Sequence, residues 1–94
     1  MSDAIRRAEH AERILGDAMV VEAIAALRST AYEAWTLATT PDQREQIWVF
    51  HKLVDRFEKY LKTVVEGGKI EAANLADEKR RSLFQKLNII PSDD

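Results

Sequence analysis

The chain has two histidines, His10 and His51, which are the side chains best suited to acid–base chemistry near neutral pH. Asp55 follows His51 by four residues, so on a helix its carboxylate lies close enough to orient the imidazole ring. One histidine and one aspartate supply too few ligands for a metal site. A hydrogen-bonded histidine at the edge of an apolar stripe is the simpler interpretation of this pair. His10 lies in the charged stretch RRAEHAER and is expected at the solvated surface.

Other residue patterns that support catalysis are missing from the sequence. A di-metal helical bundle uses Glu-x-x-His pairs, and no glutamate stands three residues before His51. The sequence contains no phosphate-binding loop and no G-x-S-x-G motif. It has no cysteine, which excludes thiolate metal sites and disulfides. We therefore expect a protein that is not an enzyme, with no catalytic residue, no metal site and no cofactor.

Two groups of basic residues are candidates for nucleic-acid contact, one near each end of the chain. They are Arg6, Arg7, Arg13, Lys79, Arg80, Arg81 and Lys86. Acidic residues are interleaved with both groups, and 14 basic and 16 acidic side chains give a net charge of −2. A single copy therefore lacks the concentrated positive field used in DNA binding, although several copies in a ring would add their patches together. DNA contact and a solvated charged surface both stay open as interpretations.

The composition favours long helices over a sheet. Glycine (3) and proline (2) are scarce, and no segment alternates strictly between polar and apolar residues. The 94 residues form at most one domain, which we expect to span 1–94. A chain of this length buries only about 60–65% of its unfolded surface, so an additional copy would help to stabilise it. No apolar run is long enough to span a membrane and the N-terminus lacks a signal-peptide core, so we expect a cytoplasmic protein without membrane contact.

Capping signals predict a short first helix over 3–15 and a longer one over 17–38. Ser2 or Asp3 can cap the first helix, Gly16 is typical of a helix end, and Asp17 is a suitable N-cap for the next helix. The alternative is one continuous helix that tolerates Gly16 at a cost of about 1 kcal/mol. One face of the second helix is expected to be apolar and rich in alanine: Val20, Ile24, Leu27, Ala31, Ala34 and Ala38.

A third helix is predicted over 41–66. Thr40 and Gln43 form a capping-box pattern around Pro41, which suits the first helical position, and Gly67 with Gly68 predicts the helix end. Its large apolar residues follow a heptad-like spacing: Ile47, Phe50, Val54, Phe57, Leu61 and Val64. Because the link to the preceding helix is short, we expect an antiparallel helical hairpin in which this seam meets the alanine-rich face.

The remaining sequence predicts a weaker helix over 70–87 and a flexible tail over 88–94. This C-terminal part either folds back on the hairpin or binds a partner. Residues that the hairpin seam leaves uncovered are the candidates for an oligomer or partner interface: Trp48, Leu53, Tyr60, Val65, Leu83 and Phe84. Trp48 lies off the seam, and it either packs on the first helix or the C-terminal tail or serves as an exposed hot spot for a partner.

Residues 11–75 resemble a family of small helical proteins of tailed bacteriophages and prophages. The likeness rests on AERIL and a helix ending near Trp35, then on QREQIWVFHKL, and then on VVEGGKIEAANL. Such proteins are encoded among head-assembly and DNA-packaging genes. The resemblance implies a role in phage assembly or packaging, and it carries no catalytic residues over to this chain.

Two classes of function follow. The first is a self-associating helical hairpin in virion assembly or DNA packaging, either small-terminase-like or head-associated. Its partners would be copies of itself, other phage head or packaging proteins, and DNA. It would act in the cytoplasm of the bacterial host or within the virion. A small-terminase subunit would normally carry an N-terminal helix-turn-helix, which is not recognisable here. The second class is a small interaction module that binds and modulates a host protein.

Overall fold

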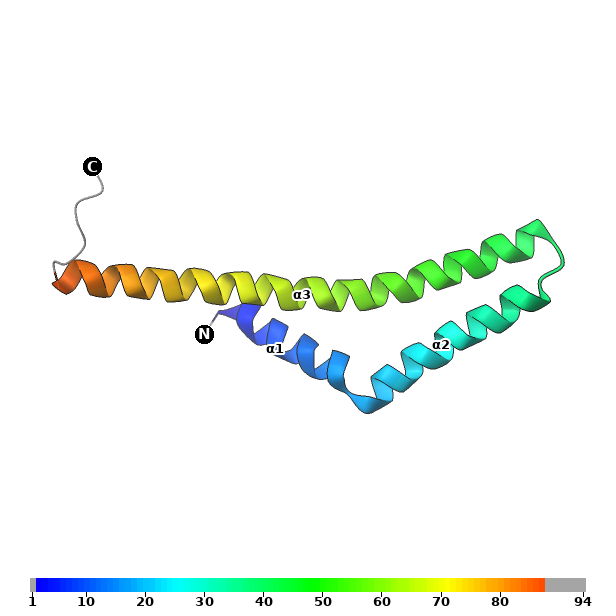
Figure 1. The fold of residues 1–94 in the computed structure, drawn as a ribbon, viewed down its shortest axis with the longest axis horizontal. Coiled ribbons are helices and arrows are strands. Elements are labelled where there is room, and N and C mark those ends of the chain that lie inside the picture. Colours follow the sequence, from blue (N-terminus) through cyan, green and yellow to red (C-terminus); the bar gives the residue numbers. More distant parts are fainter. Residues whose placement is uncertain (1, 88–94) are drawn as a thin grey trace.

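The computed structural model describes residues 2–87, which form three α-helices and no strand (Figure 1). Helix α1 spans Asp3–Gly16, α2 spans Ala18–Leu37, and α3 spans Pro41–Leu87. The predicted all-α class is therefore confirmed for this part of the chain. The predicted tail over 88–94 lies outside the described residues. Within residues 2–87, no helix combines the length and the apolar character that crossing a membrane requires.

The helix starts follow the capping residues expected from the sequence. The Ser2 hydroxyl accepts a hydrogen bond from the Ile5 amide, and an Asp17 carboxylate oxygen accepts from the second and third amides of its helix. The Thr40 hydroxyl accepts from the Gln43 amide at 3.2 Å. The Gln43 side chain in turn accepts from the amide of Thr40, which completes the capping box. The predicted break between the first two helices at Gly16 is confirmed, because α1 ends there.

The prediction that a helix ends at Gly67 and Gly68 is wrong. Instead of two helices over 41–66 and 70–87, the structure has one helix of 47 residues that passes through both glycines. A glycine ends a helix when it adopts a left-handed backbone conformation, and neither of these does so. The sequence that follows is rich in alanine, leucine, glutamate and lysine, which favour a helical backbone.

Gly68 is required because α1 crosses α3 at this residue. A Cβ atom placed on Gly68 would overlap the Ala8 side chain and lie 2.9 Å from the carbonyl oxygen of Ala4. The small side chains of both helices thus allow their backbones to approach closely. A Cβ atom on the neighbouring Gly67 would meet nothing within 4 Å, because this residue faces away from α1.

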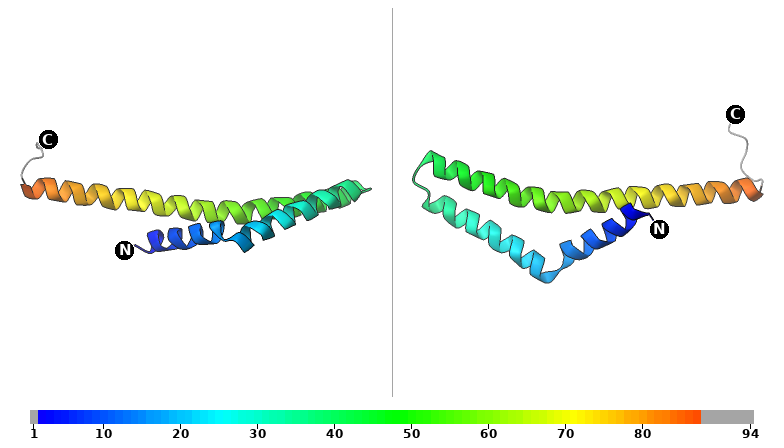
Figure 2. Two further views of the ribbon diagram at one scale, coloured as in Figure 1. Left: turned by 60° about the horizontal axis from the view of Figure 1, so that its bottom comes forward. Right: turned by 180° about the vertical axis from the view of Figure 1, so that it is seen from behind.

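Helices α1 and α2 lie one after the other along α3 and run opposite to it (Figures 1 and 2). They meet at an apex directed away from α3, and the last part of α3 extends beyond the start of α1. No other described helix lies beside this extension (Figure 2). Of the two interpretations of the C-terminal part, folding back on the hairpin is therefore wrong for 70–87, and residues 88–94 lie outside the described part. The side chains of Leu83 and Leu87 are exposed, and Phe84 is half-buried.

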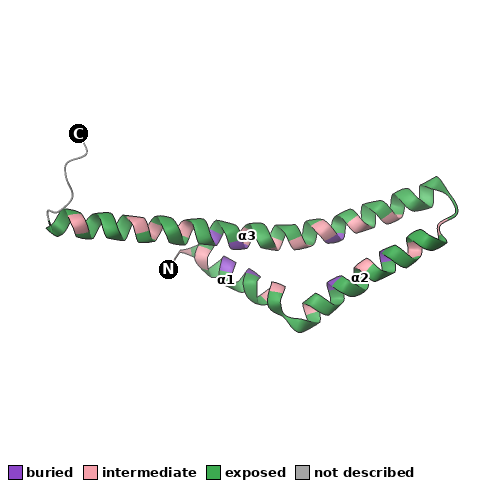
Figure 3. Cartoon of the chain, in the orientation of Figure 1, coloured by how far each residue is buried: buried purple, intermediate pink, exposed green. Residues whose placement is uncertain are grey.

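The buried positions follow the sides on which the helices face each other (Figure 3). On α3 the buried residues are Val54, Val65 and Gly68, and on the helices beside it they are Ala8 and Ala11 of α1 and Ile24 and Ala31 of α2. The predicted seam is right for Val54 and wrong for Phe50 and Phe57, whose side chains are exposed. On α2, Leu27 is likewise exposed although it was expected in the alanine-rich seam.

The molecule is a single layer of helices. Its extents are 72 × 31 × 16 Å, and the shortest is little more than the 10–12 Å diameter of one helix. The radius of gyration is 21.9 Å, against about 12 Å for a compact chain of this length. Among residues 2–87, no side chain has a relative exposure below 2%, so this part of the chain has no closed core. The layer therefore has two broad faces and almost no interior.

The two neighbouring glycines provide a matched test of the contact between α1 and α3. We expect Gly67→Ala to stabilise the protein by about 0.5–1 kcal/mol, because alanine favours a helix and has open space there. We expect Gly68→Ala to destabilise it by about 1–3 kcal/mol, because the new methyl group forces the helices apart. Urea unfolding followed by circular dichroism measures both changes. A Gly68→Ala variant as stable as Gly67→Ala would contradict this packing.

Candidate interaction faces

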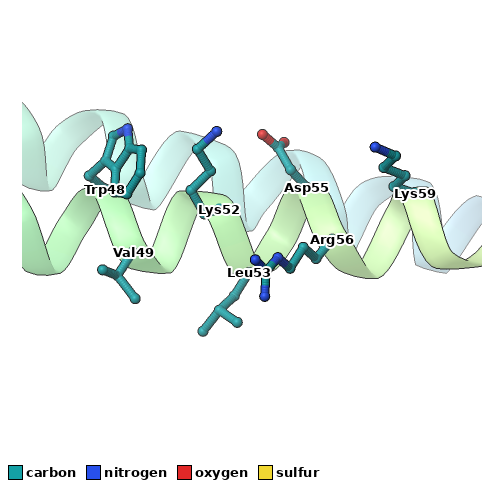
Figure 4. A pocket seen from close by; sticks show the side chains of 7 residues that line it. All are labelled: Trp48, Val49, Lys52, Leu53, Asp55, Arg56 and Lys59. Atoms are coloured by element: carbon teal, nitrogen blue, oxygen red, sulfur yellow. The ribbon is translucent and has the colours of Figure 1, made fainter.

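The two faces of the helical layer differ in chemistry, and the side chains of α3 divide between them. Figure 4 shows Trp48, Lys52, Asp55 and Lys59 along one edge of α3 and Val49, Leu53 and Arg56 along the opposite edge. The buried position Val54 lies between these two sets on the third side of the helix, toward α1 and α2. Each edge of α3 therefore belongs to one broad face of the molecule.

We call the first of these surfaces the apolar face. It consists of Leu27, Val49, Phe50, Leu53, Phe57 and Tyr60, all of which are exposed. On α3, the spacing from Phe50 to Leu53, Phe57 and Tyr60 is three, four and three residues, which keeps them on one side of the helix. A hollow of about 230 Å³ lined by Ala34 and Phe50 places this side of α3 beside α2. Leu27 precedes Ala34 by seven residues and so lies on the same side of α2.

The apolar face continues onto α1. A small hollow between α1 and α3 is lined by Ile14 on one helix and by Tyr60 and Val64 on the other. The Arg7 guanidinium donates a hydrogen bond to the Tyr60 hydroxyl at 3.4 Å, so the tyrosine is held at the junction of the two helices. The apolar surface thus spans all three helices rather than α3 alone.

We call the opposite surface the aromatic–cationic face. It consists of Arg28, Tyr32, Trp35, Trp48, His51 and Lys52, and it contains a hollow of about 340 Å³ between α2 and α3. The Lys52 ammonium lies 5.1 Å from the ring centre of Trp48, and the Arg44 guanidinium lies 5.8 Å from that of Trp35. Both distances are within the range of cation–π attraction. The two tryptophans are therefore exposed, with a cation beside each ring.

Arg28 forms two ion pairs between α2 and α3. Its guanidinium donates to Asp55 at 2.5 Å and to Glu58 at 3.2 Å. The hydrogen bond from Arg28 lowers the pKa of Asp55, and His51 adds a smaller electrostatic effect in the same direction. The same hydrogen bond to Asp55 raises the pKa of Arg28. All three side chains stay partly exposed, so solvent weakens the attraction.

His51 and Asp55 are neighbours, as their spacing predicted. The His51 Nε2 atom lies 3.5 Å from an Asp55 carboxylate oxygen. Both side chains are close to half exposed, and Asp55 already accepts the Arg28 hydrogen bond. No set of three or more histidine, aspartate and glutamate side chains in residues 2–87 is placed to bind a metal ion. This arrangement fits a structural contact between the two side chains at the edge of the hollow.

The structure separates the residues that were predicted to form one partner interface. Leu53 and Tyr60 lie on the apolar face, whereas Trp48 lies on the opposite face. The expectation that Val65 is uncovered is wrong, because this side chain is only 7% exposed on the side of α3 that carries Gly68. Leu83 is exposed, and it lies on the extension of α3 away from both faces.

Part of the basic sequence groups is engaged in contacts within the chain. Asp77 accepts from Arg80 at 2.9 Å and forms an ion pair with Arg81 at 3.3 Å. Arg7 donates to Tyr60. The other members of the two groups, Arg6, Arg13, Lys79 and Lys86, are exposed. The Asp77 ion pairs reduce the positive charge that the second group can direct at a phosphate backbone, whereas the hydrogen bond to the neutral Tyr60 hydroxyl leaves the charge of Arg7 in place.

Sequence reasoning missed Phe50, Phe57 and Leu27 as surface residues because it assigned them to the seam inside the chain. The seam that forms on α3 is Ile47, His51, Val54, Glu58, Leu61, Val65 and Gly68, all of them buried or half-buried. It has the same three-and-four spacing as the predicted one and shares three members with it. Both stripes continue to Gly68 at this spacing, so the spacing alone does not distinguish them.

The Asp55 ion pair predicts a specific dependence of stability on pH. Because the folded protein has the lower Asp55 pKa, its stabilisation is complete above about pH 4 and is lost as the pH falls through the folded value. We expect Asp55→Asn to be less stable than the parent at pH 7 and to lose less stability than the parent on acidification. Thermal melts between about pH 2.5 and pH 7 measure this. Asp77→Asn, which leaves Arg28 paired, is the control, and equal acid slopes for Asp55→Asn and the parent would contradict the ion pair.

The chain was compared with known proteins at the level of families, individual sequences and structures. No family model matches the chain, and neither a curated protein nor a solved structure is significantly similar to it. Its function must therefore be argued from its own surfaces.

Proposed function

We propose that this chain is a non-enzymatic assembly subunit that completes its core by associating with copies of itself. The observation that carries this proposal is the size of its surface. The accessible surface is 7772 Å², whereas a compact monomer of 10.7 kDa exposes about 5,500 Å². The chain thus exposes roughly 2,000 Å² more than a compact fold of its mass.

The distribution of apolar residues supports the same proposal. Stable domains consist of at least two packed layers around a hydrophobic core, and this chain provides one layer. Large apolar side chains of all three helices stay exposed or half-buried instead of forming such a core. Contiguous apolar surface of this kind marks an interaction site in a native protein. In our proposal, α2 and the first half of α3 act as an antiparallel helical hairpin, and this hairpin is the self-associating unit.

The resemblance to small helical phage proteins gives this proposal a biological context. We propose that the subunit acts in virion assembly or DNA packaging, as a small-terminase-like or head-associated protein, in the bacterial cytoplasm or in the virion. Contact with DNA would use the exposed members of the two basic groups. DNA binding is tested by an electrophoretic mobility shift with duplex DNA at low and moderate salt. The absence of a shift at low salt would show that the protein does not bind DNA.

The aromatic–cationic face favours a second candidate, a module that binds a host protein. Exposed tryptophans are typical of binding hot spots, and Trp48 is 53% exposed. A pull-down from host lysate with the parent chain and with Trp48→Ala separates the candidates. One stoichiometric host protein that is lost with Trp48→Ala supports the module, and recovery of the chain's own copies alone supports assembly.

Self-association is tested directly by mass. We expect the protein to form an oligomer at micromolar concentration, because its exposed large apolar side chains favour burial against another copy. Multi-angle light scattering and sedimentation equilibrium measure the mass over a dilution series. A monomeric mass at every concentration up to about millimolar would refute the proposed function.

A further inference from the structure

We propose that the apolar face is the surface on which a second copy of this chain docks, using its own apolar face. This inference rests on the proposed self-association and adds which of the two faces carries it. The face comprises the six residues named above, from Leu27 to Tyr60, with Ile14 and Val64 at its α1 end.

The chemistry of the face fits a copy of itself. Four large side chains of α3, from Phe50 to Tyr60, form one stripe across three helical turns. None of the six residues of the face is charged, and the charged groups that border it differ in sign along α3. Arg7 and Arg56 lie toward its Tyr60 end, whereas Asp42 and Glu45 line a hollow with Val49 at the other end (Figure 4). A self-complementary interface requires a surface that can face itself without opposing like charges, and an antiparallel pair of these stripes meets that condition because the basic end of one copy faces the acidic end of the other.

The aromatic–cationic face would oppose like charges if two copies met through it. Lys52 and Lys59 project from the same edge of α3, close to Trp48 (Figure 4). The acidic group on this edge, Asp55, is already paired with Arg28. Two copies meeting through this face would bring lysines toward lysines, and opposed like charges disfavour an interface.

The chain as a whole exposes enough surface for a stable pair. A standard protein–protein interface buries about 800 Å² on each partner. The whole chain exposes roughly 2,000 Å² more than a compact fold of its mass, and the apolar face contributes to this surplus together with the extension of α3. One additional copy on the apolar face would supply a second layer. Because both copies use the same face, the pair is closed, and the aromatic–cationic face of each copy stays on the outside.

Two substitutions by glutamate on α3 test whether the apolar face is the interface. Phe57 and Trp48 are 52% and 53% exposed, so replacing either with glutamate disturbs the single chain to a similar extent. We expect Phe57→Glu to weaken self-association by at least about 100-fold, because it places an unpaired carboxylate in an apolar interface. We expect Trp48→Glu to change it less than about threefold, because this residue lies outside the interface. Sedimentation equilibrium measures both constants, and circular dichroism checks that both variants keep their helices.

Tryptophan fluorescence supplies an independent readout. Both tryptophans of the chain, Trp35 and Trp48, line the aromatic–cationic face. Dilution of the parent protein through its dissociation range should therefore leave the emission maximum unchanged. A variant with Phe57→Trp should shift to longer wavelength over the same range, because the added indole becomes exposed to water. A shift in the parent instead would place the interface on the aromatic–cationic face and overturn the inference.

The outcomes separate this inference from the proposed function. If the parent protein is monomeric, both the proposed function and the assignment of the apolar face are refuted. An oligomeric parent that Trp48→Glu dissociates, or that Phe57→Glu leaves intact, overturns the apolar face as the interface while self-association stands. An oligomeric parent that Phe57→Glu alone dissociates supports both.

Discussion

The close contact between α1 and α3 at Gly68 is the constraint on which the arrangement of the helices depends. The backbone of α1 reaches α3 here because Ala4, Ala8 and Gly68 have little or no side chain between them. This contact fixes the register of α1, and the Glu12–Lys69 ion pair lies beside it. Once α1 is placed, the break after Gly16 directs α2 toward the beginning of α3, where Arg28 meets Asp55 and Glu58. Two contacts of different chemistry thus hold a shallow seam, one at its Gly68 end and one near its middle.

A seam of small residues has a consequence for the surface. Where Ala8, Ala11 and Ala31 face α3, the helices come close but bury little apolar area. The large side chains that a globular domain would enclose are therefore displaced to the sides of the seam. On one side they form the apolar face, and on the other they are mixed with the cations next to Trp35 and Trp48. The difference between the two faces follows from this displacement.

Local signals allowed much of the fold to be predicted, and contacts between distant residues account for the errors. The starts at Ser2, Asp17 and Thr40 depend on hydrogen bonds within three residues, and the structure has all of them. The requirement for glycine at position 68 comes from α1, some sixty residues earlier in the chain, and the local sequence does not record that contact. The choice between the two stripes on α3 likewise depends on where Arg28 and α1 dock.

The lengths of the helices leave α3 partly uncovered. Helices α1 and α2 contain 14 and 20 residues, which together fall 13 residues short of the 47 in α3. At 1.5 Å per residue the shortfall is about 20 Å of helix. Leu83 follows the buried Val65 by 18 residues, or about five helical turns, so it lies on the same side of α3 as the seam. The chain therefore makes a longer seam than its own helices can cover.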